Sequence, residues 1–552
     1  MLNFTNKVIY QIYPKSFYDS NDDGIGDLRG IIEKIPYIKT LNVDMIWFNP
    51  FFVSPQKDNG YDIADYRAID PRLGTMEDFD EMVRKLKDNH IDVMLDMVFN
   101  HTSTQHKWFQ EALKGNTEYQ NYYIIRKSDH IGKPPTNWVS KFGGSAWEKF
   151  GDTDQYYLHL YDKSQADLNW RNPKVRKELY DVLNFWIAKG VKGFRFDVFN
   201  VIGKDEKLED AQPGEDSKYL YTDKPIVHDY LKEMNQNTFG KITDSITVGE
   251  MSSTTIENSI GYTNPESHEL TMVFNFHHLK VDYTNGEKWT KSRFDFKKLK
   301  QILDNWQDGM AKGNGWNALF WNNHDQPRAI NRFADAHAYR VRSAKMLATT
   351  IHLLRGTPFI YMGEEIGMTD PDYHSISQYD DIEAINAYHM LIDSGLSEQE
   401  AFEIVHAKAR DNSRTPMQWS AASYAGFSTH HPWLAPTNHD DINVEKELKE
   451  GSIFQYYQKL IRLRKTMPII SVGGYNSFLM AHPHVFAYIR TYGNQKLLVI
   501  NNFFKHDTTV DIPSSYLNEQ SEILISNTQP HPLSRQLLLQ PYESIAYLLT
   551  SK

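Results

Sequence analysis

The sequence predicts an α/β protein built on a (β/α)8 TIM barrel, with an inserted subdomain after strand 3 and a C-terminal antiparallel β domain. Eight short apolar runs are separated by stretches whose apolar residues recur at helical spacing. The runs are almost continuously apolar, which is typical of parallel strands covered on both faces. Near residue 473 the pattern changes to short alternating strands separated by polar turns. The predicted barrel strands are 8–13, 44–48, 92–98, 193–198, 245–251, 270–276, 317–321 and 357–363.

The first three strands alternate with two helical patterns. Residues 28–41 carry apolar side chains at helical spacing between the first and second strands. Residues 76–90 do the same between the second and third strands. In a barrel of this kind the chemistry lies at the C-terminal ends of the strands, so the residues that follow the strands are the candidates for a site.

Two segments depart from a plain barrel. Residues 101–173 are rich in Tyr, Trp, Gly and Pro, and we interpret them as subdomain B, inserted between the barrel segments 1–100 and 174–472. Residues 473–552 are expected to form a sandwich-like antiparallel β domain. The strands predicted in that domain are 485–489, 496–501 and 544–548.

Composition excludes several classes of function. At 552 residues, 40% hydrophobic and 24% charged, the chain is long enough for about two to four globular domains. No stretch of about 18 apolar residues occurs, so we expect no membrane span. A formal charge of −11 argues against nucleic-acid binding. The absence of cysteine excludes disulfides and fits a cytoplasmic protein.

Charged residues stand at the ends of several predicted strands. Arg195 and Asp197 are two residues apart, so their side chains lie on the same side of the strand 193–198. Taken alone, such a pair is more typical of a structural ion pair. Glu250 and Asp325 also follow apolar runs, however, and a barrel brings such strand ends together. Two carboxylates that flank a glycosidic bond can cleave it, one as the nucleophile and one as the general acid.

The local surroundings predict different roles for these acids. Arg195 favours the ionised form of Asp197, which is therefore the expected nucleophile. Glu250 follows an apolar strand, where desolvation raises the pKa of a carboxyl group and keeps it protonated as the general acid. Asp325 and the neighbouring His324 are expected to hold sugar hydroxyls. The alternative is that each of these residues, taken singly, is structural.

Several runs resemble the α-amylase family, glycoside hydrolase family 13. The four signature regions of the family are matched by DMVFNH at 96–101, GFRFD at 193–197, VGE at 248–250 and NHD at 323–325. The run QADLNW at 165–170 resembles a fifth region, which closes the inserted domain. The runs that narrow the resemblance to the oligo-1,6-glucosidase group are YQIYP at 10–14, FGGSAW at 142–147 and RDNSRTPMQW at 410–419.

The resemblance implies a retaining α-glucosidase that acts at the non-reducing end of its substrate. The residues matched to the nucleophile, the acid/base and the third carboxylate are, in that order, Asp197, Glu250 and Asp325. The resemblance also implies that Asp58 and Arg414 form a clamp that closes the glucose pocket, and that Tyr61 is its stacking ring. The implied hydroxyl partners are Arg195, His101 and His324.

A basic cluster lies just beyond the sixth predicted strand, within the segment 275–291. Lysine binds phosphate as a point charge, and the alternative is a solvated basic face. This segment and the run GEMSST at 249–254 resemble the trehalose-6-phosphate hydrolases of the family. The resemblance implies cleavage of a small phosphorylated disaccharide, α,α-trehalose 6-phosphate, to glucose and glucose 6-phosphate. The expected phosphate ligands are His277, Lys280 and Lys288. The alternative is an oligo-1,6-glucosidase or dextran glucosidase with the same machinery and no need for phosphate.

The loop 19–27 places oxygen ligands alternately around a glycine, much as an EF-hand loop begins. It lacks the glutamate that completes an EF-hand, and an Asx-rich turn is the alternative. In the glucosidases that the chain resembles, the equivalent loop holds one structural Ca²⁺, and we expect the same here. The implied ligands are Asp19, Asn21, Asp23, the Ile25 carbonyl and Asp27. We expect no organic cofactor, and a monomer.

Overall fold

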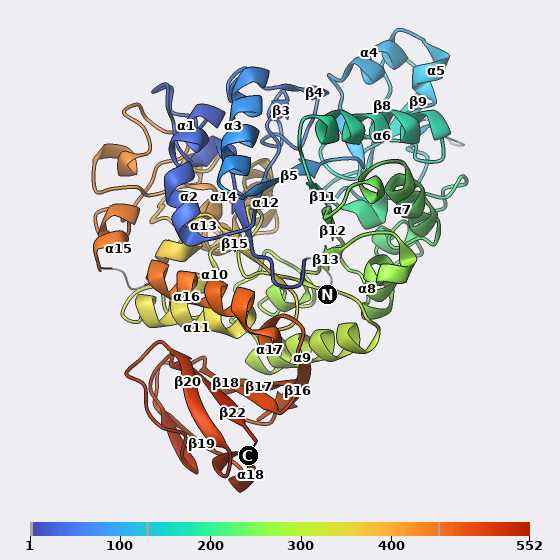
Figure 1. Cartoon of the computed structure of the whole chain (residues 1–552). Coiled ribbons are helices and arrows are strands. Elements are labelled where there is room, and N and C mark those ends of the chain that lie inside the picture. Colours follow the sequence, from blue (N-terminus) through green and yellow to red (C-terminus); the bar gives the residue numbers. More distant parts are fainter. Residues whose placement is uncertain (1–3, 129–131, 451–452, 552) are drawn as a thin grey trace.

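The computed structural model describes residues 4–128, 132–450 and 453–551, so the outer ends of the predicted segments 1–100 and 473–552 fall outside it. A barrel of parallel strands forms the centre, surrounded by helices, and the C-terminal strands form a separate β layer at one side (Figure 1). Within the described ranges, no helix is both long and apolar enough to cross a bilayer. The predicted fold class is confirmed.

The barrel sheet has eight parallel strands in the order β13-β12-β11-β5-β2-β1-β15-β14. An isolated parallel bridge from Val273 on β13 to Asn317, next to β14, joins the two edge strands and closes the barrel. Each strand falls inside one of the predicted runs. The strands are β1 (Ile9–Ile12), β2 (Met45–Phe48), β5 (Asp92–Met97), β11 (Gly193–Phe196), β12 (Ile246–Glu250), β13 (Met272–Phe274), β14 (Ala318–Leu319) and β15 (Thr357–Tyr361).

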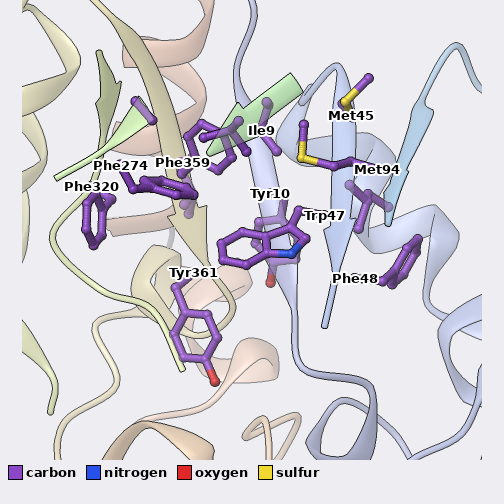
Figure 2. Close-up of a cluster of buried hydrophobic side chains, with 14 of the residues drawn as sticks. Ile9, Tyr10, Met45, Trp47, Phe48, Met94, Phe274, Phe320, Phe359 and Tyr361 are labelled. Carbon is purple, nitrogen blue, oxygen red and sulfur yellow. The ribbon is translucent and has the colours of Figure 1, made fainter. Parts of the chain in front are cut away.

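Large apolar side chains fill the barrel (Figure 2). The Trp47 ring on β2 packs against Phe274 on β13 and Phe359 on β15, with ring centroids 5.5 Å and 6.1 Å apart. Phe274 and Phe359 meet edge to face at 4.6 Å. The interior is therefore a packed core, and a ligand site has room only at the ends of the strands.

One predicted helix, 28–41, is two helices in the structure, α1 (Leu28–Glu33) and α2 (Ile35–Leu41). Pro36 lies in the first turn of α2, where its missing N–H is tolerated. In the interior of a longer helix, the same proline would remove a hydrogen bond to residue 32 and clash with its carbonyl, so the chain breaks there. The predicted helix 76–90 is confirmed as α3 (Met76–Asp88).

The remaining helices of the barrel segments follow in chain order. They are α6 (Pro173–Ala188), α7 (Ile226–Asn237), α8 (Ile256–Thr263), α9 (Phe296–Lys312), α10 (Ala329–Phe333), α11 (Arg340–His352), α12 (Ile382–Asp393), α13 (Glu398–Lys408), α14 (Asp411–Arg414), α15 (Val444–Glu450), α16 (Ile453–Thr466) and α17 (Pro468–Ser471). A short antiparallel pair, β3 (Phe52–Val53) and β4 (Asp65–Ile69), extends the loop after β2.

The inserted subdomain leaves and re-enters the barrel through adjacent strands. β6 (His101–Ser103) pairs antiparallel with β10 (Gln165–Asp167), which places His101 opposite Asp167. Between them lie α4 (Lys107–Leu113), α5 (Thr117–Gln120) and a three-stranded antiparallel sheet of β7 (Ile125–Lys127), β9 (Gln155–Leu158) and β8 (Trp147–Lys149). The subdomain therefore stands on the C-terminal side of β5, beside the strand ends where a site is expected.

The C-terminal strands form a five-stranded sheet in the order β16-β17-β18-β22-β20 and a two-stranded sheet of β19 and β21. The larger sheet packs on the barrel helices through contacts of β16 with α9, β17 with α17 and β18 with α11 (Figure 1). The strands are β16 (Gly474–Phe478), β17 (Val485–Tyr492), β18 (Gln495–Asn502), β19 (Thr508–Asp511), β20 (Gln520–Ser526), β21 (Gln536–Leu539) and β22 (Ser544–Thr550), with the short helix α18 (Ser514–Leu517) before β20.

Candidate active site

Three carboxylates meet around the guanidinium of Arg195, which is fully buried on β11. Its Nη1 donates to Asp96 Oδ1 at 2.8 Å and to Asp197 Oδ1 at 2.7 Å. Its Nη2 donates to Glu250 Oε2. The predicted pair of acids therefore comes together, and Asp96 is a third acid that the sequence analysis did not single out.

Strand register explains this meeting. Arg195 on β11 is in register with Asp96 on β5 and with Val248 on β12, two residues before Glu250. Side chains of a barrel point inward at every second position along a strand. Asp96, Arg195 and Glu250 therefore face the same interior, at or just below the C-terminal ends of three adjacent strands.

The chain turns sharply after Asp197. Val198 has φ 38° and ψ 42°, a left-handed conformation that is rare for a β-branched residue and costs about 1–3 kcal/mol. Such strain persists only where the surrounding structure imposes it, and it clusters at functional sites. Here the turn ends β11 and leaves Asp197 at the C-terminal face of the barrel.

Burial raises the pKa of both Asp197 and Glu250, and the positive charge of Arg195 opposes the shift in each case. The negative charge of Glu250 also raises the pKa of Asp197, so the two acids are in electrostatic contact. Two buried acids in such contact share a proton and titrate as a pair. The pair thus provides one acid and one carboxylate, which is the starting condition for acid-assisted cleavage.

His324 and Asp325 follow β14 and are held from several sides. The Gln11 amide donates to His324 Nδ1 at 3.0 Å, which leaves the ring proton on Nε2, 3.1 Å from Asp325 Oδ2. The Tyr61 ring stacks on the His324 ring at 5.2 Å with an interplanar angle of 4°. Burial lowers the pKa of His324, so the imidazole is neutral and carries a single ring proton.

Asp58 pairs with Arg410 and not with the predicted Arg414. Arg410 Nη2 lies 3.1 Å from Asp58 Oδ1. Arg414 instead donates to the His324 carbonyl at 2.7 Å and to Asp325 Oδ1 at 3.0 Å. The two arginines are four residues apart along one helical turn, so both reach the site. Arg410 pairs with Asp58 because both residues line the pocket, whereas Arg414 lies beneath it and is only 1% exposed.

Gln165 on β10 connects the inserted subdomain to this clamp. Its Oε1 accepts from the Asp162 N–H, so its Nε2 donates to Asp58 Oδ2 at 3.0 Å and to the Tyr61 carbonyl at 3.1 Å. His101 Nε2 lies 3.1 Å from the same carbonyl. Burial lowers the pKa of His101 to about 4, so its ring is neutral near pH 7.

One pocket of about 200 Å³ lies at the C-terminal end of the barrel. Of the residues described above, those that line it are Asp58, Tyr61, His101, Asp197, Val198, Glu250, Asp325 and Arg410. Ligand pockets for drug-sized molecules occupy roughly 300–1,000 Å³, so this one suits a single sugar ring better than a chain. Beside the residues already described, its wall includes Lys141, Phe142 and Glu383. A larger cavity of about 510 Å³ at the opposite end of the barrel contains none of the predicted site residues.

The residues predicted to bind phosphate differ in their surroundings. His277 Nε2 lies 2.8 Å from the Thr254 carbonyl, so this nitrogen is occupied by a structural contact. Lys288 forms an ion pair with Glu383 at 2.8 Å. Lys280 is half-buried, and its Nζ has no hydrogen bond or ion pair with any residue that the structure describes. Lys280 is therefore the predicted ligand with a free charge.

Lys141 is a cation that the sequence analysis missed. It lines the pocket from the inserted subdomain, and its charge interacts with those of Lys280 and Lys218. Lys218 is paired with Asp216 at 3.0 Å, whereas Lys141 Nζ forms no ion pair within the described part of the chain. We refer to Lys141 and Lys280 as the lysine pair. The only sequence signal for Lys141 is its position directly before the run 142–147.

The loop 19–27 is compact, and two of its acids are buried, with Asp19 3% and Asp27 4% exposed. Asp19 Oδ2 accepts from the Gly24 N–H and from the Ser428 hydroxyl. Neither acid forms an ion pair with another described residue. Buried carboxylates without a cationic partner, together with the oxygens of this loop, fit a hard cation such as Ca²⁺. Over the described ranges, no three acidic or histidine side chains form a metal cluster by themselves, so Ca²⁺ stays a prediction.

Comparisons with known proteins agree with this geometry. The family pattern described as "Alpha amylase, catalytic domain" matches residues 11–473, and the pattern described as "Alpha-amylase SusG C-terminal domain" matches 485–546. The chain is 52% identical over 548 residues to trehalose-6-phosphate hydrolase of Bacillus subtilis (strain 168), covering 98% of this chain and 97% of that protein. It is 46% identical to an oligo-1,6-glucosidase of Parageobacillus thermoglucosidasius, with 98% of each chain covered. The crystal structure of Bacillus licheniformis trehalose-6-phosphate hydrolase matches with a TM-score of 0.95, 52% identity and full coverage of both chains.

Proposed function

Because the chain belongs to the α-amylase family and is a glycoside hydrolase, we propose that it hydrolyses α,α-trehalose 6-phosphate to glucose and glucose 6-phosphate by double displacement. The observation that carries the proposal is one pocket lined by Asp197, Glu250 and Lys141, together with the charge of Lys280, which interacts with that of Glu250. The two acids cleave the glycosidic bond, and the positive charges of the lysines bind the phosphate of the leaving sugar.

The first step forms a covalent intermediate. A carboxylate oxygen of Asp197 attacks the anomeric carbon of the glucose held in the pocket, and the bond to the bridging oxygen breaks. Glu250 gives its proton to that oxygen, so glucose 6-phosphate leaves as an alcohol. Carboxyl groups about 5–5.5 Å apart serve this retaining mechanism, and the contact of both with Arg195 supports such a spacing.

The second step releases glucose. Glu250, now a carboxylate, takes a proton from a water molecule, whose oxygen attacks the anomeric carbon. The bond to Asp197 breaks, and both carboxyl groups return to their starting protonation. The configuration at the anomeric carbon is inverted twice and is therefore retained.

The other site residues position the sugar. Asp325 and His101, which line the pocket, would accept from or donate to its hydroxyls, and Asp325 would oppose the positive charge that develops on the ring. His324 lies beneath them with Nε2 3.1 Å from Asp325 Oδ2, and it would orient that carboxylate. The clamp of Asp58 and Arg410 supplies a buried, charged edge for one end of the sugar. A site built to hydrogen-bond hydroxyls discriminates strongly against analogues that lack them, because its buried polar groups would stay unpaired.

The rival function is that of an oligo-1,6-glucosidase, to which the chain is also similar. The deciding experiment measures kcat/KM for trehalose 6-phosphate, trehalose and isomaltose under the same conditions. We expect the phosphorylated sugar to be preferred by about 10²-fold or more, because unphosphorylated sugars leave the lysine pair without its counter-charge. A preference for isomaltose would contradict the proposal and favour the rival.

We propose further that the protein acts as a cytoplasmic monomer with one structural Ca²⁺ in the loop 19–27 and no organic cofactor. The ligands would be the carboxylates of Asp19, Asp23 and Asp27, the Asn21 amide oxygen and the Ile25 carbonyl. The ion would neutralise two buried acids and stabilise the loop, and it would take no part in catalysis. Light scattering after size-exclusion chromatography tests the monomer, since a dimer would double the measured mass.

A further inference from the structure

One member of the lysine pair shares the pocket with the proposed general acid. Lys141 and Glu250 both line the pocket, one from the inserted subdomain and one from β12. Lys280 follows η6 (His277–Leu279), just after β13, the strand beside β12. The charge of Glu250 acts on each lysine. Neither Nζ forms an ion pair with a described acid, although the charge of Asp216 also acts on Lys141.

A positive charge that acts on Glu250 works against general-acid catalysis. Positive charge favours the carboxylate and lowers the pKa of an acid, whereas a general acid must hold its proton until the leaving oxygen takes it. The charged groups that act most strongly on Glu250 are Arg195 and Asp197 on β11, Asp96 on β5 and Asp325 after β14. The charges of those four residues stay the same whichever substrate binds. The charge of the lysine pair, in contrast, is neutralised when the substrate carries an anionic group.

We propose that a phosphate dianion bound at the lysine pair promotes proton donation by Glu250, so that the phosphate of the substrate contributes to the chemical step as well as to binding. This inference rests on the proposed function. The phosphate cancels the lysine charges, Glu250 keeps its proton to higher pH, and the bridging oxygen is protonated as its bond to carbon breaks. A sugar without phosphate binds to a protein whose acid is partly ionised.

The proposal predicts a further activity. Inorganic phosphate together with an unphosphorylated α-glucoside should reproduce the two parts of the natural substrate, so free phosphate should activate the enzyme. Activation should appear only for glucosides with a poor leaving group, because a good leaving group departs without a proton. A lysine pair that only binds the substrate would instead change KM and leave kcat the same for both kinds of glucoside.

The experiment uses the full-length protein with trehalose and with 4-nitrophenyl α-glucoside, each with and without inorganic phosphate. Phosphate should raise kcat for trehalose about tenfold above neutral pH and move the alkaline limb of its pH profile upward by about one unit, with little change for the aryl glucoside. No effect of phosphate, simple inhibition, or equal activation of both glucosides would overturn the proposal.

Variants test the origin of the effect. Lys280→Met should abolish phosphate activation and, without phosphate, move the alkaline limb for trehalose upward, because the opposing charge is gone. A lysine with a structural role would not shift that limb. Lys291→Met is the matched control, since Lys291 is exposed and paired with Glu403 at 2.6 Å, and it should keep the activation. If trehalose 6-phosphate is cleaved with the same kcat as trehalose, phosphate does not promote proton donation by Glu250, and the proposed function still stands. If trehalose 6-phosphate is not cleaved at all, the proposed function itself is wrong.

Discussion

Arg410 Nη2 lies 3.1 Å from Asp58 Oδ1, although the two residues are separated by 352 positions in the chain. Asp58 comes from the loop after β3, and Arg410 directly precedes α14. Gln165 of the inserted subdomain holds the second carboxylate oxygen of Asp58 at 3.0 Å. Three distant segments thus meet at one aspartate, and the pocket depends on all of them.

Asp58→Asn should lower kcat/KM for trehalose 6-phosphate by about 10²-fold, or ~2.7 kcal/mol. The variant loses the charge that faces Arg410 and turns an amide donor toward either Arg410 or Gln165. The measurement is steady-state kinetics, with circular dichroism to verify folding. Asp80→Asn is a suitable control, because Asp80 is exposed and pairs only with Lys189 among the described residues. A change of less than threefold for Asp58→Asn would contradict the clamp.

Glu250→Gln and Asp197→Asn should differ in their dependence on the leaving group. General acids contribute about 10²–10⁴-fold, so Glu250→Gln should lose that factor on trehalose 6-phosphate and much less on 4-nitrophenyl α-glucoside. Asp197→Asn should be inactive on both, because no covalent intermediate can form. If Glu250→Gln lost the same factor in activity on both substrates, Glu250 would not be the general acid.

The surroundings of the lysines predict unequal effects on phosphate recognition. Lys280→Met should raise KM for trehalose 6-phosphate by about tenfold, which corresponds to ~1.4 kcal/mol for one lost charge. Lys288→Met should have a smaller effect, because Lys288 is already paired with Glu383. KM values for the phosphorylated and aryl substrates are the measurement. A larger effect at Lys288 would mean that this ion pair opens when the substrate binds.

The preference for phosphate should depend on pH. Desolvation lowers the pKa of Lys141 to about 8, and the charge of Lys280 acts in the same direction. A lysine is charged below its pKa, and a phosphate monoester becomes a dianion above about pH 6. The ratio of kcat/KM for trehalose 6-phosphate to that for the aryl glucoside should therefore be highest between about pH 6 and 8. Lys141→Arg should extend the plateau to higher pH, and an unchanged alkaline limit would exclude Lys141 as its cause.

Calcium should stabilise the fold without entering the reaction. At a Ca²⁺ concentration 100 times the dissociation constant, binding adds about 2.7 kcal/mol to the free energy of unfolding. A chelator should lower Tm, and added Ca²⁺ should restore it, with kcat unchanged while the protein remains folded. Asp19→Ala should remove the Ca²⁺ dependence of Tm. A Tm that does not respond to chelator would contradict the metal site.

Much of the barrel was predictable because its strands are short apolar runs whose ends are marked by polar residues. The predicted run 193–198 contains β11, and its alternation placed Arg195 and Asp197 on one side, as the structure confirms. The run 28–41 predicts one helix and forms two, because helical spacing continues through Pro36 although the backbone hydrogen bonds do not.

The amino-acid sequence by itself determined the fold class and the acids of the site, since burial of apolar runs and the period of a strand are local properties. Tertiary structure decided which charges pair. Arg410 and Arg414 are one helical turn apart and equally available by sequence, yet only Arg410 lies at the depth of Asp58. Lys288 and Lys280 belong to one basic segment, yet Glu383 pairs with Lys288 and not with Lys280. Electrostatic interactions depend on distances of a few ångströms, and those distances are set by packing between segments far apart in the chain.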